Sequence, residues 1–242
     1  ALYYSVFMVV FSVVIMISLR QLYSKMLKGF SKKTKNYKLR LNNLIVSVAI
    51  SLVLFIPVPG LGKSLTDYFN LFFSSGNILN YFLVSVASVF TGLILAVSVW
   101  YIRNGKGGRK KIVPVRSALR MSVYSIPAHI IPGASKVAFS SVNLALCDVN
   151  SGVIFREVYF YLAPQIFVVN LIRALLLIFN GVHINVASLV IGAVAAALAS
   201  LLIVSLIRKA DSDKLLLIFG IYSILFGIGA IAYTMMPVFS GV

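Results

Sequence analysis

The sequence predicts an all-α protein that crosses a membrane about five or six times. Three observations lead to this prediction. The 242 residues are 60% hydrophobic, only 11% are charged, and the mean hydropathy is +1.01. The apolar residues also come in stretches long enough to cross a bilayer core of ~30 Å. A chain with so few polar residues cannot cover the surface of a water-soluble domain.

The first part of the chain, residues 1–120, is predicted to hold three crossings joined by loops. The crossings run from about Leu2 to Leu19, from about Leu44 to Pro57 and from about Tyr81 to Ile102. A basic stretch at residues 20–40 follows the first crossing. We expect it to be a loop against anionic lipid headgroups, or to include a helix lying on the membrane surface.

The charge of the chain is strongly one-sided, with 22 Lys and Arg against 5 Asp and Glu. Nucleic-acid binding is one source of such a balance. Here the basic residues gather in loops at residues 20–40 and 103–120, which is typical of the positive-inside rule and indicates no nucleic-acid partner. Two crossings separate these loops, so both are expected inside and the first residue outside.

The second part, residues 121–242, is expected to be the functional half. It begins with I-P-A-H-I-I-P-G-A-S at Ile126 to Ser135, whose prolines and glycine predict a broken or re-entrant segment. The apolar stretch from Val153 to Ile207 would form ~80 Å of helix, so it must be a long tilted helix or a hairpin. A last helix is expected from Leu215 to about Met236.

Two places could break the long apolar stretch, Pro164 and Asn180-Gly181. If the helix runs through Gly181, then Asn170, Arg173, Asn180 and His183 share one broad face. Such a polar stripe is typical of an ion or proton path.

Arg173 is the most informative of these polar residues. A guanidinium stays charged, and in a bilayer core this costs ~3 kcal/mol. The alternative to a path is structural, with Arg173 paired to a carboxylate and His183 packed as a hydrogen-bonded core residue. Glu157 is a second candidate for the path, or else a headgroup-level residue paired with Arg156.

We recognise no enzyme motif, and we expect neither catalytic chemistry nor a cofactor in this chain. The glycines near residues 105–108 lack the full pattern of a phosphate loop. Two histidines and one cysteine make no metal site. No serine has a histidine–acid pair placed beside it.

The second half resembles stator subunit a of the F-type ATP synthase. That family carries a glutamate, a proline, a membrane-embedded arginine, an asparagine and a histidine in this order, although the spacing after Arg173 differs here. The matching residues are Glu157, Pro164, Arg173, Asn180-Gly181 and His183. The segments A-H-I-I-P-G-A-S at Ala128 to Ser135 and A-I-A-Y-T-M-M around Tyr233 resemble two further stretches of the family.

The resemblance implies a proton-translocating subunit of the mitochondrial inner membrane. Arg173 would face the carboxylate of a rotating c-ring and keep it ionised on one side of the path. The implied partners are the c-ring, other membrane-embedded stator subunits and lipid, including cardiolipin at the basic loops. The implied proton-path residues are Glu157, Asn180, His183, Asn170 and Tyr233. The alternatives are a structural or assembly subunit of a respiratory complex and a solute transporter subunit.

Overall fold

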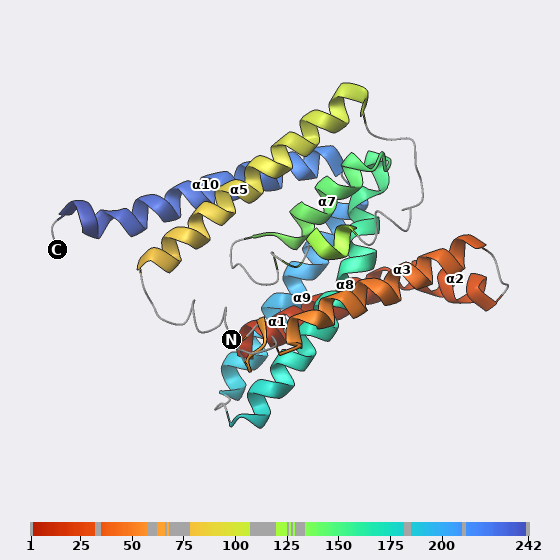
Figure 1. The fold of residues 1–242 in the computed structure, drawn as a ribbon, viewed down its shortest axis with the longest axis horizontal. Helices are drawn as coiled ribbons and strands as arrows, with labels where there is room; N and C mark the ends of the chain where they lie inside the picture. The colour runs from red at the N-terminus through yellow and green to blue at the C-terminus, as the bar shows by residue number, and fades with distance from the viewer. Residues whose placement is uncertain are drawn as a thin grey trace. The chain divides into compact units, whose positions relative to one another are not determined.

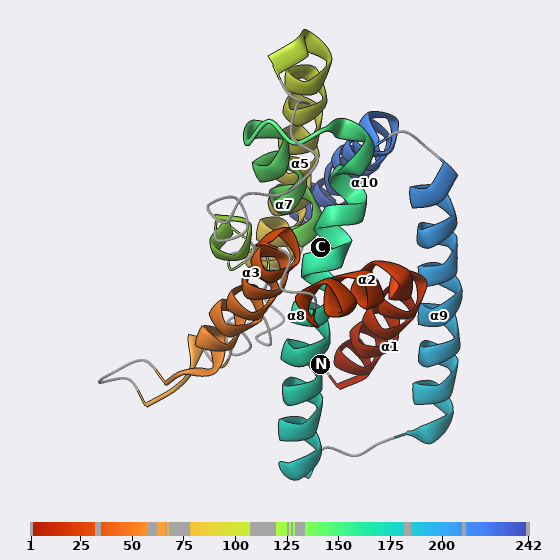
Figure 2. The same cartoon turned by 90° about the vertical axis from the view of Figure 1, so that its right-hand side faces the viewer.

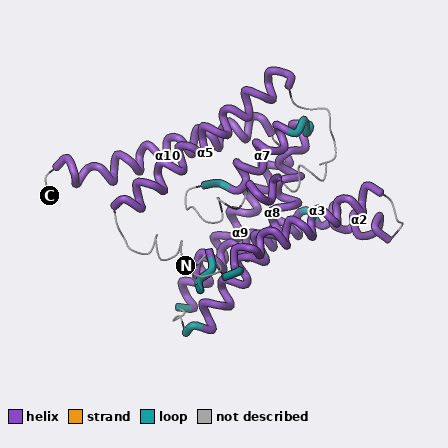
Figure 3. The backbone as a smooth tube through the Cα atoms, in the orientation of Figure 1, coloured by secondary structure: helices purple, strands orange, loops and turns teal. Residues whose placement is uncertain are grey.

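In its described part, the computed structural model consists of helices joined by short turns and loops, which confirms the all-α prediction (Figures 1 and 3). Among the described residues, five helices are long and apolar enough to cross a membrane. The bent pair Leu2–Ser18 with Arg20–Gly29 is a sixth candidate. The structure describes residues 2–31, 35–57, 62–65, 67, 78–106, 120–124, 126, 128, 134–181, 185–209 and 212–240.

The chain divides into two compact units, each of which is made from two separate segments. Unit 1 comprises Ala1–Ser51 and Arg156–Ala210. Unit 2 comprises Leu52–Phe155 and Asp211–Val242. The boundary at residue 120 expected from the sequence stays a prediction.

Unit 1 contains the first three helices and most of the long hairpin. Its elements are α1 (Leu2–Ser18), α2 (Arg20–Ser31), α3 (Lys35–Leu52), α8 (Ser151–Phe179) from Arg156 onward, and α9 (Val186–Lys209). Helices α1 and α9 lie side by side (Figure 2). The Tyr3 hydroxyl accepts a hydrogen bond from the backbone N–H of Asn185 at 3.0 Å, so α1 begins beside the start of α9.

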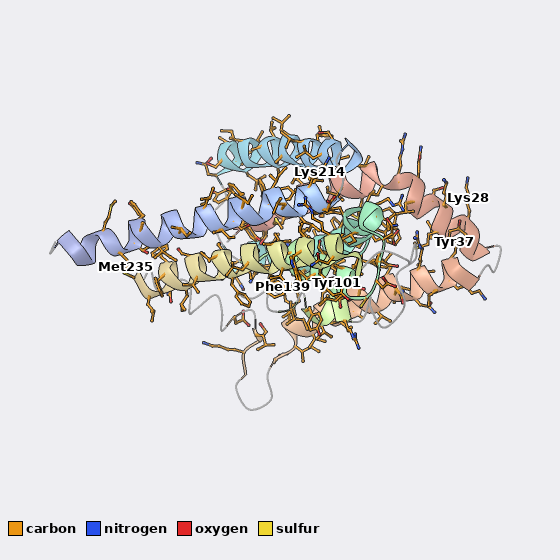
Figure 4. All side chains as sticks on the ribbon, turned by 90° about the horizontal axis from the view of Figure 1, so that it is seen from above. Lys28, Tyr37, Tyr101, Phe139, Lys214 and Met235 are labelled. Atoms are coloured by element: carbon orange, nitrogen blue, oxygen red, sulfur yellow. The ribbon has the colours of Figure 1, made fainter. Side chains whose placement is uncertain are left out.

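Unit 2 is built around two long helices that pack against each other. Its elements are η1 (Val53–Phe55), α5 (Ile78–Tyr101), η2 (Ile102–Lys106), α7 (Lys136–Leu146), the first turn of α8, and α10 (Ser212–Ser240). Figure 1 shows α5 beside α10, and Figure 4 shows Lys214 and Met235 toward opposite ends of α10.

Glycines allow α5 and α10 to approach closely. A Cβ on Gly92 would lie 2.5 Å from the carbonyl oxygen of Gly220, a distance that no real contact reaches. The two helices run antiparallel, because Arg103 in η2, just after the end of α5, pairs with Asp213 at the start of α10 at 3.5 Å. Small residues therefore set the spacing of this pair, as is common between membrane helices.

The long apolar stretch is a hairpin that breaks at Asn180-Gly181 and not at Pro164. Gly181 has a φ of +74°, a conformation that glycine adopts without strain. Pro164 lies inside α8, which continues to Phe179. One lost backbone hydrogen bond is tolerated in a membrane helix when neighbouring groups compensate. The helix therefore does not run through Gly181, and the predicted common face for Asn180 and Arg173 is not formed.

Candidate anion-binding site

Helix α7 begins at the middle of α5, deep within a predicted membrane span. The backbone N–H of Ser135 donates a hydrogen bond to Oγ1 of Thr91 at 3.3 Å. Thr91 lies 13 residues after Ile78 and 10 residues before Tyr101. At 1.5 Å per residue it is ~20 Å from one end of α5 and ~15 Å from the other. The start of α7 therefore lies near mid-depth.

The start of α7 has a strong preference for negative charge. Ser135 is the N-cap, and its hydroxyl accepts a hydrogen bond from the N–H of Ala138 at 3.2 Å. The first-turn amides of a helix and its dipole attract anions. Lys136 is the first helical residue and adds a cation, and the first turn has no acidic side chain. In a membrane, a helix start of this kind can bind an anionic group.

Polar side chains are also buried on the two helices that meet here. They are Ser88 and Thr91 on α5, and Ser140, Ser141 and Asn143 on α7. The hydroxyls of Ser140 and Ser141 have no hydrogen-bond partner. Hydroxyl groups and amides can donate to phosphate or carboxylate oxygens. Buried polar side chains therefore lie on both helices of the α5–α7 pair.

A second stretch of the sequence in unit 2 repeats the residue order found at the start of α7. The pattern P-G-x-x-K occurs at Pro59 to Lys63 and again at Pro132 to Lys136. After the first copy, Ser64 and Asp67 cap each other. The Ser64 N–H donates to Oδ2 of Asp67 at 3.0 Å, and the Asp67 N–H donates to the Ser64 hydroxyl at 3.3 Å. Each copy thus brings a lysine next to a capping serine.

Glu157, a predicted path residue, is instead paired within its own unit. It is fully buried, and its Oε1 lies 2.8 Å from Nη2 of Arg40 on α3. The predicted pairing with Arg156 also exists, at a longer 3.8 Å. The guanidinium of Arg40 lies over the ring of Phe160, 5.9 Å from its centroid. This carboxylate therefore joins α3 to α8.

Arg173 lies closer to a helix end than its sequence surroundings indicate. Phe179, the end of α8, is only six positions after Arg173, or ~9 Å along the helix. It lies within electrostatic range of the hydroxyl of Tyr4 on α1. Tyrosines beside an arginine near a helix end are typical of the interfacial belt of a membrane protein.

The structure describes three more of the predicted site residues, Asn170, Asn180 and Tyr233. Asn170 is buried, and its side-chain amide donates to the carbonyl of Ile166 at 2.8 Å. Asn180 is exposed in the turn after α8, and Tyr233 is 76% exposed on α10 in unit 2. His183 lies outside the described residues.

Ser135 and Lys136 are the functional candidates that sequence reasoning missed. The prolines and glycine of Ile126 to Ser135 predict a broken segment, but they do not by themselves identify Ser135 as a helix cap. The available signal was a Pro-Gly pair followed by a serine and a lysine. Among the residues that the structure describes, no group of three or more His, Cys, Asp or Glu could hold a metal ion.

The comparison with protein families identifies a different relationship from the one that the sequence indicated. A family model described as "Bacitracin resistance protein BacA" matches residues 4–229. No curated protein matches the chain. The interpretation as subunit a of an ATP synthase is therefore wrong, and with it ATP synthesis, proton transport, the c-ring and stator partners and the mitochondrial inner membrane. The respiratory-complex and transporter alternatives do not match this family either.

The misleading feature was the order of Glu157, Pro164, Arg173, Asn180 and His183 along the chain. Order alone does not place residues together: Glu157 pairs with Arg40 inside the chain, and the helix that carries Arg173 ends before Asn180. The family match covers most of the chain, from α1 into α10. The chain therefore belongs to the family of the bacitracin resistance protein BacA.

Proposed function

We propose that this protein is an undecaprenyl pyrophosphate phosphatase of the cell membrane, acting in cell-wall synthesis. Family membership supports this activity. The single structural observation that supports it best is the start of α7, which offers an anion-binding site at mid-depth of α5. A lipid diphosphate needs such a place, because its headgroup is anionic and its chain is apolar.

In this proposal, Lys136 and the first-turn amides of α7 bind the phosphoryl oxygens of the headgroup. A water molecule attacks the terminal phosphorus, and the bond from that phosphorus to the bridging oxygen breaks. The products are inorganic phosphate and the lipid monophosphate. Negative charge develops on the bridging oxygen as it leaves, and fixed positive groups in a low-dielectric site stabilise it.

The second P-G-x-x-K copy supplies a candidate for the other phosphate group. Lys63 is exposed and directly precedes the capping residue Ser64. A diphosphate has two phosphoryl groups, and a lysine acts on each as a compact point charge. We propose that Lys63 and Lys136 both contribute to headgroup binding.

A second candidate function is the binding and movement of a lipid phosphate without hydrolysis. One observation favours it: three of the acidic side chains are already engaged in contacts within the chain. The chain has 5 Asp and Glu. Of these, Glu157 pairs with Arg40, Asp213 pairs with Arg103, and Asp67 bonds to Ser64. These three carboxylates are engaged in structural contacts and are poorly placed to activate a water molecule.

The test is a phosphate-release assay on the full chain reconstituted in liposomes with undecaprenyl pyrophosphate. We expect inorganic phosphate to be released, and Lys136→Gln to reduce kcat/KM about tenfold or more, because it removes a charged hydrogen-bond donor. Lys214→Gln on α10 is the matched control and should leave the rate unchanged. Saturable binding of the lipid without phosphate release would favour the second candidate. If the chain neither releases phosphate nor binds the lipid, both candidate functions are wrong.

A further inference from the structure

Helix α2 presents a basic face that the proposed phosphatase activity does not use. Around the helix, the buried side consists of Met26 and Gly29, with Tyr23 at its edge. The opposite side carries exposed polar residues, namely Arg20, Gln21, Ser24, Lys25 and Lys28. No acidic residue interrupts this face. One side of α2 therefore packs on protein, and the other is a continuous positive surface.

The buried side of α2 is firmly attached to α8. The hydroxyl of Tyr23 donates a hydrogen bond to the carbonyl of Phe160 at 2.8 Å, and the two rings stack with centroids 4.6 Å apart. At the far end of α2, a Cβ on Gly29 would overlap the ring of Tyr37 on α3. Figure 4 shows Lys28 and Tyr37 together at this end of unit 1. The orientation of the basic face within unit 1 is therefore fixed.

The direction of α2 places it at a membrane surface. It is bent by 64° from α1, which is apolar along its length. If α1 crosses the bilayer, α2 lies closer to the membrane plane, at the height of the lipid headgroups. A short helix with a strongly polar face and a separate apolar face is typical of this position.

The surrounding charge is also positive. Residues 1–52 contain eight Lys and Arg, and the first acidic residue of the chain is Asp67. Among the described basic residues of this segment, Arg40 forms a salt bridge with Glu157 of α8. Basic residues next to a membrane helix attract anionic lipids, each with an appreciable free energy.

We propose that the exposed face of α2 binds the headgroups of anionic phospholipids, with Lys25 and Lys28 as the principal contacts. This surface is separate from the start of α7 and serves a different ligand, a bulk membrane lipid. It would fix the height and tilt of unit 1 in the bilayer. The proposal does not depend on phosphatase activity.

A single-tryptophan variant can report which lipids surround α2. Trp100, the only tryptophan, is replaced in Trp100→Phe, and Leu27→Trp then places the reporter on an exposed position of α2. The full chain is reconstituted in equimolar phosphatidylglycerol and phosphatidylcholine. Bromine is carried by phosphatidylglycerol in one preparation and by phosphatidylcholine in the other. Fluorescence quenching in the two preparations gives the relative occupancy of each lipid.

We expect the phosphatidylglycerol preparation to quench the reporter more strongly, corresponding to an enrichment of about threefold that decreases with salt. Lys25→Gln together with Lys28→Gln should abolish the preference, whereas the control Lys214→Gln should keep it. A reporter at Leu198→Trp, on the exposed face of α9, should show no preference. Equal quenching at position 27, a preference that survives loss of both lysines, or no quenching by either lipid would each overturn the proposal.

Discussion

Two regions of this protein carry charge into the membrane in opposite ways. In α8, an unbroken helix holds Glu157, which is neutralised by Arg40 from α3. At α7, a helix starts near the middle of α5, and its positive end carries Lys136 as the first helical residue. The first arrangement is closed, because the chain supplies both partners. In the second, the positive end of a helix favours an anionic ligand. A buried charge in a membrane helix thus indicates function less directly than a broken helix does.

The largest expected effect comes from breaking the ion pair between Glu157 and Arg40. Glu157→Gln leaves the Arg40 guanidinium buried without a counter-charge, which should lower the free energy of unfolding by about 3–5 kcal/mol. Denaturant unfolding in detergent micelles measures this change. Replacing both partners, as in Arg40→Leu with Glu157→Leu, should cost much less. Wild-type stability of Glu157→Gln would show that the pair does not hold α3 to α8.

A smaller effect is expected in the scaffold that supports α7. Gly92 is adjacent to Thr91 and faces Gly220 on α10. Gly92→Ala forces α5 and α10 apart and should cost about 1–3 kcal/mol of stability. The matched control is Gly229→Ala on α10, where an added Cβ meets no atom within 4 Å. Equal stability of the two variants would contradict the close packing of α5 on α10.

The smallest effect concerns the cap of α7. Ser135→Ala removes the hydrogen bond to the Ala138 N–H and should destabilise the start of α7 by about 1 kcal/mol. Hydrogen exchange at the first turn of α7 measures this change. Ser135→Asn retains a capping side chain and should exchange like the wild type. Unchanged exchange in Ser135→Ala would show that the cap does not hold the helix start.

The sequence was sufficient to predict the fold class and the approximate number of crossings, because apolar stretches of ~20 residues have few alternatives. It named Asn180-Gly181 as one of two possible breaks but could not choose between it and Pro164. The broken segment predicted before Ser135 falls largely outside the described residues and stays a prediction. It could not show that Glu157 meets Arg40, because 117 residues separate them. It placed Arg173 in the middle of an apolar stretch, whereas the helix end at Phe179 lies one and a half turns further on.

The most direct test of the proposed site compares two basic residues in one binding measurement. The affinity of the full chain for a non-hydrolysable polyprenyl diphosphate analogue is measured in detergent by isothermal titration for Lys136→Gln and for Arg173→Gln. If the start of α7 holds the headgroup, Lys136→Gln weakens binding about tenfold or more, and Arg173→Gln changes it by less than about twofold. The reverse ranking, with Arg173→Gln as the damaging change, would contradict the assignment of the site to α7.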